Sequence, residues 1–156
     1  MTLESHGGGT PLGMTTHVAP VDWSFADRPT VSGPTSHALA RQVVVGPEQG
    51  AIHTELAVGA LAPGGWLQRH FHSFEEALYV LAGELLVEID GHAHRLETGD
   101  YTLMPVGTWH ALGNPGTAQA RWLSLSTPLS VEMEPLPSFR PPFQTADAVR
   151  FMQGLP

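Results

Sequence analysis

Three histidines and one glutamate near the middle of the chain are of the types that bind metal ions. His70 and His72 are separated by one residue, and Glu76 follows three residues later. In an extended strand alternate side chains share a face, so His70 and His72 point the same way with Cα atoms ~6.5 Å apart. Glu76 can reach the same side if the intervening turn keeps the register. We therefore predict that His70 and His72 can bind one metal ion and that Glu76 can join them, whereas strand alternation says nothing about His110, which the fold must bring there.

Turn-forming residues lie on both sides of these four in the sequence. They are Gly64, Gly83, Gly99, Pro105, Gly107 and Asn114. Such residues mark the ends of short strands, so the candidate ligands are expected next to turns of a β-scaffold. The other histidines are assigned to structural positions: His6, His17 and His37 to an N-terminal arm, and His92 and His94 to a hairpin. His53 lies on an expected strand and is either a core residue or part of a pocket.

The composition excludes several classes of function. The chain has 15 acidic residues, 7 arginines and no lysine, for a formal charge of -8. A nucleic-acid surface needs a basic face, so no nucleic-acid partner is expected. Without Lys there is no side-chain amine for Schiff-base chemistry, and without Cys there is no thiolate nucleophile, disulfide or Cys-type zinc site. No signal peptide and no membrane-spanning run are recognised, so we expect a cytoplasmic protein without a membrane partner.

The remaining pattern is that of a protein built from short strands. The chain has 17 Gly and 14 Pro in 156 residues and no long stretch of helical periodicity. Strands are predicted at 41–45, 51–61, 66–72, 76–81, 84–89, 93–96, 101–104 and 121–126, with a break at Pro63-Gly64-Gly65 and a hairpin turn at Asp90-Gly91. Regularly spaced strands without helices predict an all-β sandwich, jelly roll or small barrel.

The two ends of the chain differ from this middle part. Residues 1–34 are predicted to be an N-terminal arm, 35–129 the β-barrel domain and 130–156 a C-terminal extension. In the arm, Val21, Trp23 and Phe25 alternate, so this part either adds a strand to a sheet edge or a neighbouring subunit, or is poorly ordered. The extension is Pro-rich and is expected to end in a short helix that Thr145 caps and Gly154 closes.

The segments Gly64–Gly83 and Gly99–Asn114 resemble the two conserved motifs of the cupin superfamily, with no departure in residue type or spacing. Fifteen residues separate them, and one motif pair resembles a single-domain cupin. The resemblance implies an antiparallel jelly-roll β-barrel in which His70, His72, Glu76 and His110 bind one divalent metal. It also implies a homodimer.

Three imidazoles and one carboxylate suit iron, manganese, nickel, zinc or copper, with iron as the leading expectation. Four protein ligands leave two adjacent positions of an octahedral site for substrate and dioxygen, or substrate and water. Gln68 and Trp66 share the expected strand face of His70 and are predicted to line a substrate pocket. Glu75 is expected to point outward, with Arg69 as a candidate partner.

The leading hypothesis for function is a metal-dependent dioxygenase acting on a small oxygen-rich organic molecule. The alternatives are a metal-containing isomerase, lyase or hydrolase, and a cupin that binds a small ligand without catalysis. Phosphorylated sugars fit less well, because a phosphate needs Lys or Arg around the pocket. Only Arg69, Arg95 and Arg121 are assigned to the barrel region, and none is predicted to face inward.

Overall fold

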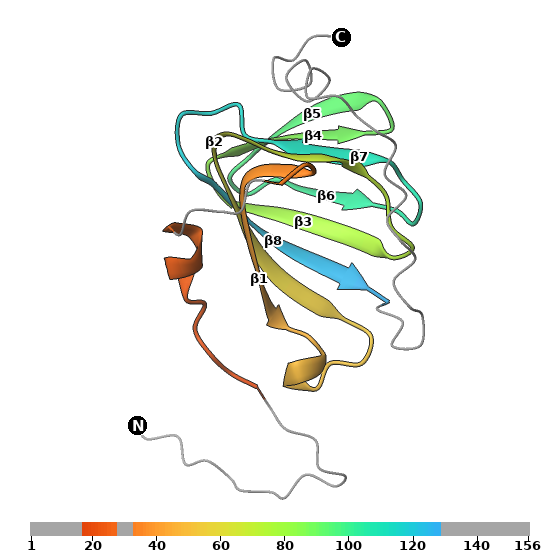
Figure 1. Ribbon diagram of the computed structural model, residues 1–156. Helices are drawn as coiled ribbons and strands as arrows, with labels where there is room; N and C mark the ends of the chain where they lie inside the picture. Colours follow the sequence, from red (N-terminus) through yellow and green to blue (C-terminus); the bar gives the residue numbers. More distant parts are fainter. Residues whose placement is uncertain (1–16, 28–32, 129–156) are drawn as a thin grey trace, which may run out of the picture.

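The computed structural model describes residues 17–27 and 33–128. Its strands are β1 (Ser36–Val45), β2 (Glu55–His70), β3 (Glu75–Ala82), β4 (Glu84–Ile89), β5 (His92–Glu97), β6 (Tyr101–Met104), β7 (His110–Gly113) and β8 (Ala120–Thr127), with two 3-10 helices, η1 (Trp23–Asp27) and η2 (Pro47–Gln49). The strands pair antiparallel in the order β5-β4-β7-β2-β8-β3-β6, and β1 pairs with β2. Figure 1 shows β5, β4 and β7 stacked above β3 and β8.

This architecture is the jelly-roll β-barrel, so the predicted fold class is confirmed. Most predicted strands are present, but β1 begins at Ser36 instead of 41 and β2 at Glu55 instead of 51, so His53 lies outside the strand on which it was expected. The Asp90-Gly91 turn joins β4 to β5 with both residues at positive φ. Strand β7 was not predicted, because its sequence His-Ala-Leu-Gly contains none of the β-branched, Phe, Tyr or Trp residues that indicate a strand.

The strand break predicted at Pro63-Gly64-Gly65 is wrong, because β2 is one strand of 16 residues that runs through these three. The strand changes partners here instead: β8 pairs with it up to Leu61, and β7 pairs with it from Trp66. Pro63 and Gly64 are exposed, so the missing N–H of proline leaves no buried group unpaired. Gly64 N donates to the Asn114 carbonyl at 3.0 Å, and Asn114 N donates to the Gly65 carbonyl at 2.9 Å. The residue that follows β7 therefore fixes the backbone of β2 at the point where β2 changes partners.

Alternation along the strands separates an inner from an outer face. In β8, Trp122, Ser124 and Ser126 are buried, while Leu125 between the serines is 39% exposed. The inner side chains form one apolar cluster, made of Leu61, Leu78, Val80, Leu85, Val87, Met104, Leu112, Ala120 and Trp122. The predicted face shared by Glu76, Leu78 and Val80 is therefore the inner one. The metal-ligand candidates lie at one end of this interior, where apolar residues give way to polar ones.

Of the two alternatives for the segment around Val21, Trp23 and Phe25, the added strand is wrong, because Trp23–Asp27 forms the short helix η1. The Asp22 carboxylate accepts hydrogen bonds from the Ser24 N–H at 2.9 Å and the Ser24 hydroxyl at 3.0 Å, which favours a turn over an extended strand. Trp23 and Phe25 stack on each other and pack against the outer face of β1 and β2. The predicted C-terminal helix and most of the arm lie outside the described residues.

Candidate metal centre

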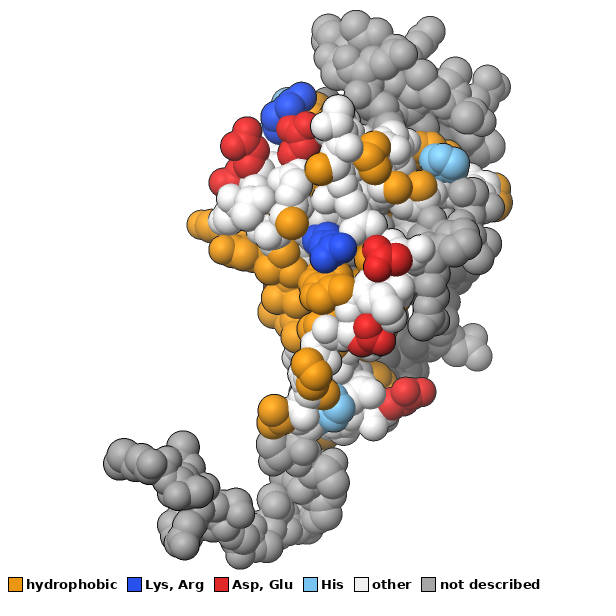
Figure 2. Space-filling model, turned by 90° about the vertical axis from the view of Figure 1, so that its left-hand side faces the viewer, with side chains coloured by type: hydrophobic (Ala, Val, Ile, Leu, Met, Phe, Trp, Pro, Cys, Tyr) orange, Lys and Arg blue, Asp and Glu red, His pale blue; other side chains and the backbone are white. Residues whose placement is uncertain are grey.

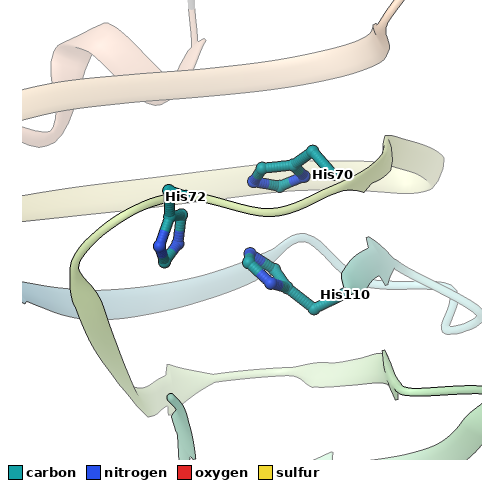
Figure 3. A group of neighbouring side chains, drawn as sticks. All are labelled: His70, His72 and His110. Carbon is teal, nitrogen blue, oxygen red and sulfur yellow. The ribbon is translucent and has the colours of Figure 1, made fainter. Parts of the chain in front are cut away.

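Three histidines that are distant in sequence meet at the end of the barrel interior. His70 is the last residue of β2, His72 follows the strand, and His110 opens β7 directly opposite His70 in the antiparallel ladder. One ring nitrogen from each lies within 4.8 Å of the other two. Figure 3 shows the three rings turned toward one shared space, His70 and His72 from one side and His110 from the other. These three could hold a metal ion.

Backbone carbonyls determine which nitrogen of each ring is available. The Nδ1 atoms of His70, His72 and His110 lie 2.8, 2.6 and 2.9 Å from the carbonyl oxygens of residues 68, 74 and 108. A carbonyl oxygen only accepts hydrogen bonds, so each Nδ1 carries its hydrogen and each neutral ring keeps a lone pair on Nε2. In metal-binding histidines, too, one ring nitrogen donates its hydrogen to an oxygen acceptor while the other nitrogen faces the metal.

Glu76, the second residue of β3, completes this group. Its Oε2 lies 3.2 Å from His72 Nε2 and 3.9 Å from His110 Nε2. With Nδ1–H already donated, His72 can hydrogen-bond to this carboxylate only if Nε2 takes up a second proton. When the three rings are neutral, their Nε2 lone pairs and the Glu76 carboxylate converge on one space. Such an arrangement attracts a cation.

Burial supports the same conclusion. His110 is 1% exposed, and its Nε2 is buried without a hydrogen-bond partner among the described residues. Burial, reinforced by the nearby His70, lowers the pKa of His110 from 6.5 to about 4, so the ring is neutral near pH 7. Burial by itself raises the pKa of Glu76, but the hydrogen bond and charge of His72 outweigh it and the net direction is downward. An orphaned buried acceptor beside an ionised carboxylate fits a bound divalent metal.

The two predicted pocket residues lie next to the histidines along β2. Gln68 provides the carbonyl that accepts from His70 Nδ1, and the Trp66 ring stacks on His37 with centroids 6.4 Å apart. The ladder between β2 and β7 has an irregularity between Leu67 and His70, so strict alternation does not carry the face of His70 back to Trp66. Substrate contact by Gln68 and Trp66 stays a prediction.

Behind the histidines, the outer face of the same strands carries an ionic and aromatic cluster. Glu75 is exposed, as predicted, but the acidic partner of Arg69 is Glu88, with Arg69 Nε 3.1 Å from its Oε2. The prediction that Arg69 pairs with Glu75 is wrong, because β4 brings Glu88 under Arg69. The Arg69 guanidinium also lies over the Trp109 ring, 5.4 Å from its centroid.

One arginine whose strand position faces the inner side of the barrel, Arg41, was missed in the sequence, although its side chain is partly exposed. Arg41 on β1 lies opposite Gly59, and its neighbour two residues earlier, Leu39, packs against the core cluster. Arg41 therefore shares the inner face, and its charge contributes to lowering the pKa of Glu76. Alternation from Leu39 to Arg41 was a signal in the sequence, but the inner face of β1 follows only from its pairing with β2.

A family model for the cupin domain matches residues 57–126, which contain all four candidate ligands. This part of the chain, residues 57–126, belongs to the cupin superfamily. Among curated cupin relatives, the tetracenomycin polyketide synthase protein TcmJ of Streptomyces glaucescens is 29% identical over 147 residues, 88% of this chain and 93% of TcmJ. Protein SchB of Streptomyces halstedii is 34% identical over 82 residues, but the match spans only 52% of this chain and 59% of SchB.

Solved structures of similar proteins agree with this fold. The polyketide cyclase RemF of Streptomyces resistomycificus superposes with a TM-score of 0.66 at 21% identity, covering 88% of this chain and 94% of RemF. KdgF of Halomonas sp. gives a TM-score of 0.54 at 21% identity, covering 62% of this chain and 84% of KdgF. At these identities the likeness is one of fold.

The surface bears on the expected partners of this cupin. On the face drawn in Figure 2, basic side chains stand singly, with acidic ones nearby, and hydrophobic side chains gather between them. A basic stripe suited to nucleic acid is not seen on that face. Within residues 17–27 and 33–128, no helix is long and apolar enough to cross a membrane.

Proposed function

We propose that this cupin is a metal-dependent polyketide cyclase, which closes a ring in a small molecule rich in carbonyl and hydroxyl groups. Its metal ligands are His70, His72, Glu76 and His110. The observation that carries the proposal is the convergence of three imidazole rings and one carboxylate around a His110 Nε2 that is buried without a hydrogen-bond partner among the described residues. The substrate class is taken from TcmJ and RemF, which match 88% of the chain each.

The chemistry needed is modest and redox-neutral. An intramolecular aldol condensation forms one C–C bond between an enol carbon and a carbonyl carbon. The proton lost from the enol ends on the carbonyl oxygen, and water leaves when the ring becomes aromatic. When bound, a divalent metal would supply a Lewis acid for the substrate oxygens.

The protein's own side chains have separate tasks in this scheme. The backbone carbonyls that hold the Nδ1–H groups fix the three imidazoles before substrate arrives, so ring orientation costs nothing at the moment of reaction. The apolar cluster deeper in the barrel keeps water away from the reacting atoms. A polycarbonyl substrate that the protein holds in one conformation closes into one ring. The same substrate free in solution closes into several different rings.

The test uses a synthetic N-acetylcysteamine thioester of a linear poly-β-keto acid, which closes without enzyme into a mixture of rings. We expect the metal-loaded protein to narrow the mixture to one product that has lost water, without uptake of dioxygen. His70→Ala should restore the spontaneous mixture, while His94→Ala, which changes an exposed histidine on β5, should behave as wild type. If metal-loaded wild type gives the same product mixture as the reaction without enzyme, the proposal is wrong.

A dioxygenase is the second candidate, favoured by the same set of three histidines and one carboxylate, which suits iron. The same assay separates the two: a dioxygenase consumes dioxygen and yields products heavier by oxygen atoms. An isomerase, lyase or hydrolase would change the substrate without oxygen uptake and without a new ring. A non-catalytic cupin would bind the thioester and leave its products unchanged.

Three further predictions belong with this proposal. We propose that the barrel domain spans residues 35–129 between an arm, 1–34, and an extension, 130–156. We also propose that the protein is a cytoplasmic homodimer with one metal, iron first, in each subunit. Light scattering coupled to size-exclusion chromatography, with metal analysis of the peak, checks mass and stoichiometry together.

A further inference from the structure

A row of polar side chains crosses the inner face beside the metal-ligand candidates. Arg41 on β1 pairs with Glu55 on β2, Glu55 lies opposite Ser126 on β8, and Ser126 lies opposite Glu76 on β3. We call these four residues the polar row. Directly opposed residues of antiparallel strands share a face and have Cβ atoms roughly 5 Å apart. The polar row therefore forms a continuous path from Arg41 to a candidate metal ligand.

Packing shows that Arg41 points to the inner side. Gly59, its partner on β2, has no room for a side chain, because a Cβ there would lie 2.3 Å from the Trp122 ring of the core cluster. Ala40, which lies next to Arg41 in the chain, points the other way and packs in the outer cluster with Ala26 and Ala60.

Among the four arginines of the described residues, Arg41 alone has this position. Arg69 is paired with Glu88 behind the histidines, Arg95 lies on the exposed strand β5, and Arg121 lies over Trp23 on the outside. In a chain of net charge -8, most of the surface repels an anion. Among the described residues, Arg41 is therefore the arginine of the inner face that can bind a negatively charged group, if that group replaces Glu55 as its partner.

The partner of Arg41 can be exchanged at little cost. The side chains of Arg41 and Glu55 are 41% and 22% exposed, and solvated pairs of this kind contribute roughly 0–1 kcal/mol. Guanidinium groups bind carboxylates through two parallel hydrogen bonds, a geometry that a ligand carboxylate offers as well as Glu55 does. Ser126, 2% exposed on the inner face, adds a hydroxyl between Arg41 and Glu76.

We propose that Arg41 is a substrate-binding residue, which recognises an anionic oxygen group, a carboxylate above all, on the molecule bound at the metal centre. The inference rests on the proposed function for the identity of that molecule, and it narrows the substrate class to acids. An acid held by Arg41 places the rest of the molecule along the polar row toward Glu76. Substrates without the negative charge bind more weakly by the loss of this contact.

The test compares 3,5-dihydroxybenzoate with its methyl ester, which differ by one charge, using calorimetry on zinc-loaded and on metal-free protein. Wild type is expected to bind the acid about tenfold more tightly than the ester, the equivalent of one charged contact. Arg41→Gln should lose this preference in both forms. Arg95→Gln is the matched control, because Arg95 is also paired across strands with a glutamate, Glu84, but lies outside. It should keep the preference.

Equal affinity for acid and ester in wild type, absence of acid binding up to ~10 mM, or a preference that survives in Arg41→Gln would each overturn the inference. Circular dichroism of Arg41→Gln checks that the barrel is intact, so a lost preference is not a lost fold. Failure of the proposed function gives a different result, which is absent zinc uptake or an unchanged mixture of cyclised products. The calorimetry on metal-free protein still measures whether Arg41 binds the acid.

Discussion

At the scale of single residues, His110 is the most informative side chain of this cupin. Its Nε2 is buried and without a hydrogen-bond partner among the described residues, which costs free energy unless a ligand compensates it. Replacing His110 by Ala should lower zinc affinity at least about 100-fold, since one of few donors and its fixed orientation are lost. Calorimetry with a competing chelator measures this. His92→Ala on the exposed hairpin is the control, and equal affinities for both variants would contradict the assignment.

The protonation of His110 also predicts how the metal-free protein responds to acid. The pKa of this histidine falls from 6.5 in the unfolded chain to about 4 in the folded one. Between these values the unfolded chain binds more protons, so stability is full above pH 6.5 and is lost as the pH falls toward 4. Complete loss corresponds to something on the order of 3 kcal/mol. The lowered pKa of Glu76 acts in the same direction below pH 4.5.

Urea unfolding of EDTA-treated protein at several pH values measures this dependence. In His110→Gln the ring is gone, and the decline between pH 6.5 and 4 should be shallower than in wild type. Parallel curves for the two proteins would show that His110 does not titrate with the shift described.

Much of the candidate site could be predicted at this scale, and some could not. The spacing of His70, His72 and Glu76 is local, so strand alternation placed them without a structure. Arg41 was missed because its direction depends on which face of β1 meets the core, and that is decided by pairing with a strand some 20 residues away. The Arg69–Glu88 pair was missed for the same reason.

At the scale of elements, close packing between β2 and β8 is a second point that can be tested. The Trp122 ring fills the space over Gly59, where an added Cβ would come within 2.3 Å of it. Gly59→Ala should therefore destabilise the protein by about 1–3 kcal/mol through overpacking. Gly33→Ala is the matched control, because nothing lies within 4 Å of a Cβ there, and its unfolding should be unchanged.

Chemical denaturation of both alanine variants measures the difference. If Gly59→Ala is as stable as wild type, the ring of Trp122 does not occupy this place. If the double variant Gly59→Ala/Trp122→Phe regains part of the loss, the contact itself is responsible.

The elements themselves were largely predictable, because turns at Gly and Asn-type positions and alternation within β3, β4 and β8 are local signals. Two elements were not. Strand β2 continues through Pro63 because it exchanges one partner strand for another at an exposed bend. Helix η1 replaces the alternating pattern of Val21 to Phe25 because the Asp22 side chain stabilises a turn, and the aromatic rings pack together on one side.

At the scale of the whole molecule, metal binding should couple to folding. The candidate ligands come from β2, β3 and β7, and the unfolded chain does not hold them together. A metal present at 1,000 times its dissociation constant stabilises the folded state by about 4 kcal/mol. This should raise the melting temperature by roughly 10 °C in calorimetry. The increase should vanish with EDTA and be absent in His110→Ala; equal melting temperatures with and without metal would contradict this coupling.

The central claim is that His70, His72, Glu76 and His110 bind one divalent metal, and anomalous diffraction tests it most directly. Crystals of the metal-loaded protein are measured on both sides of the metal's absorption edge. We predict one anomalous peak in each chain, about 2.0–2.2 Å from the Nε2 atoms of the three histidines and from a Glu76 oxygen. A peak elsewhere, or none within bonding distance of both His70 and His110, would contradict the account.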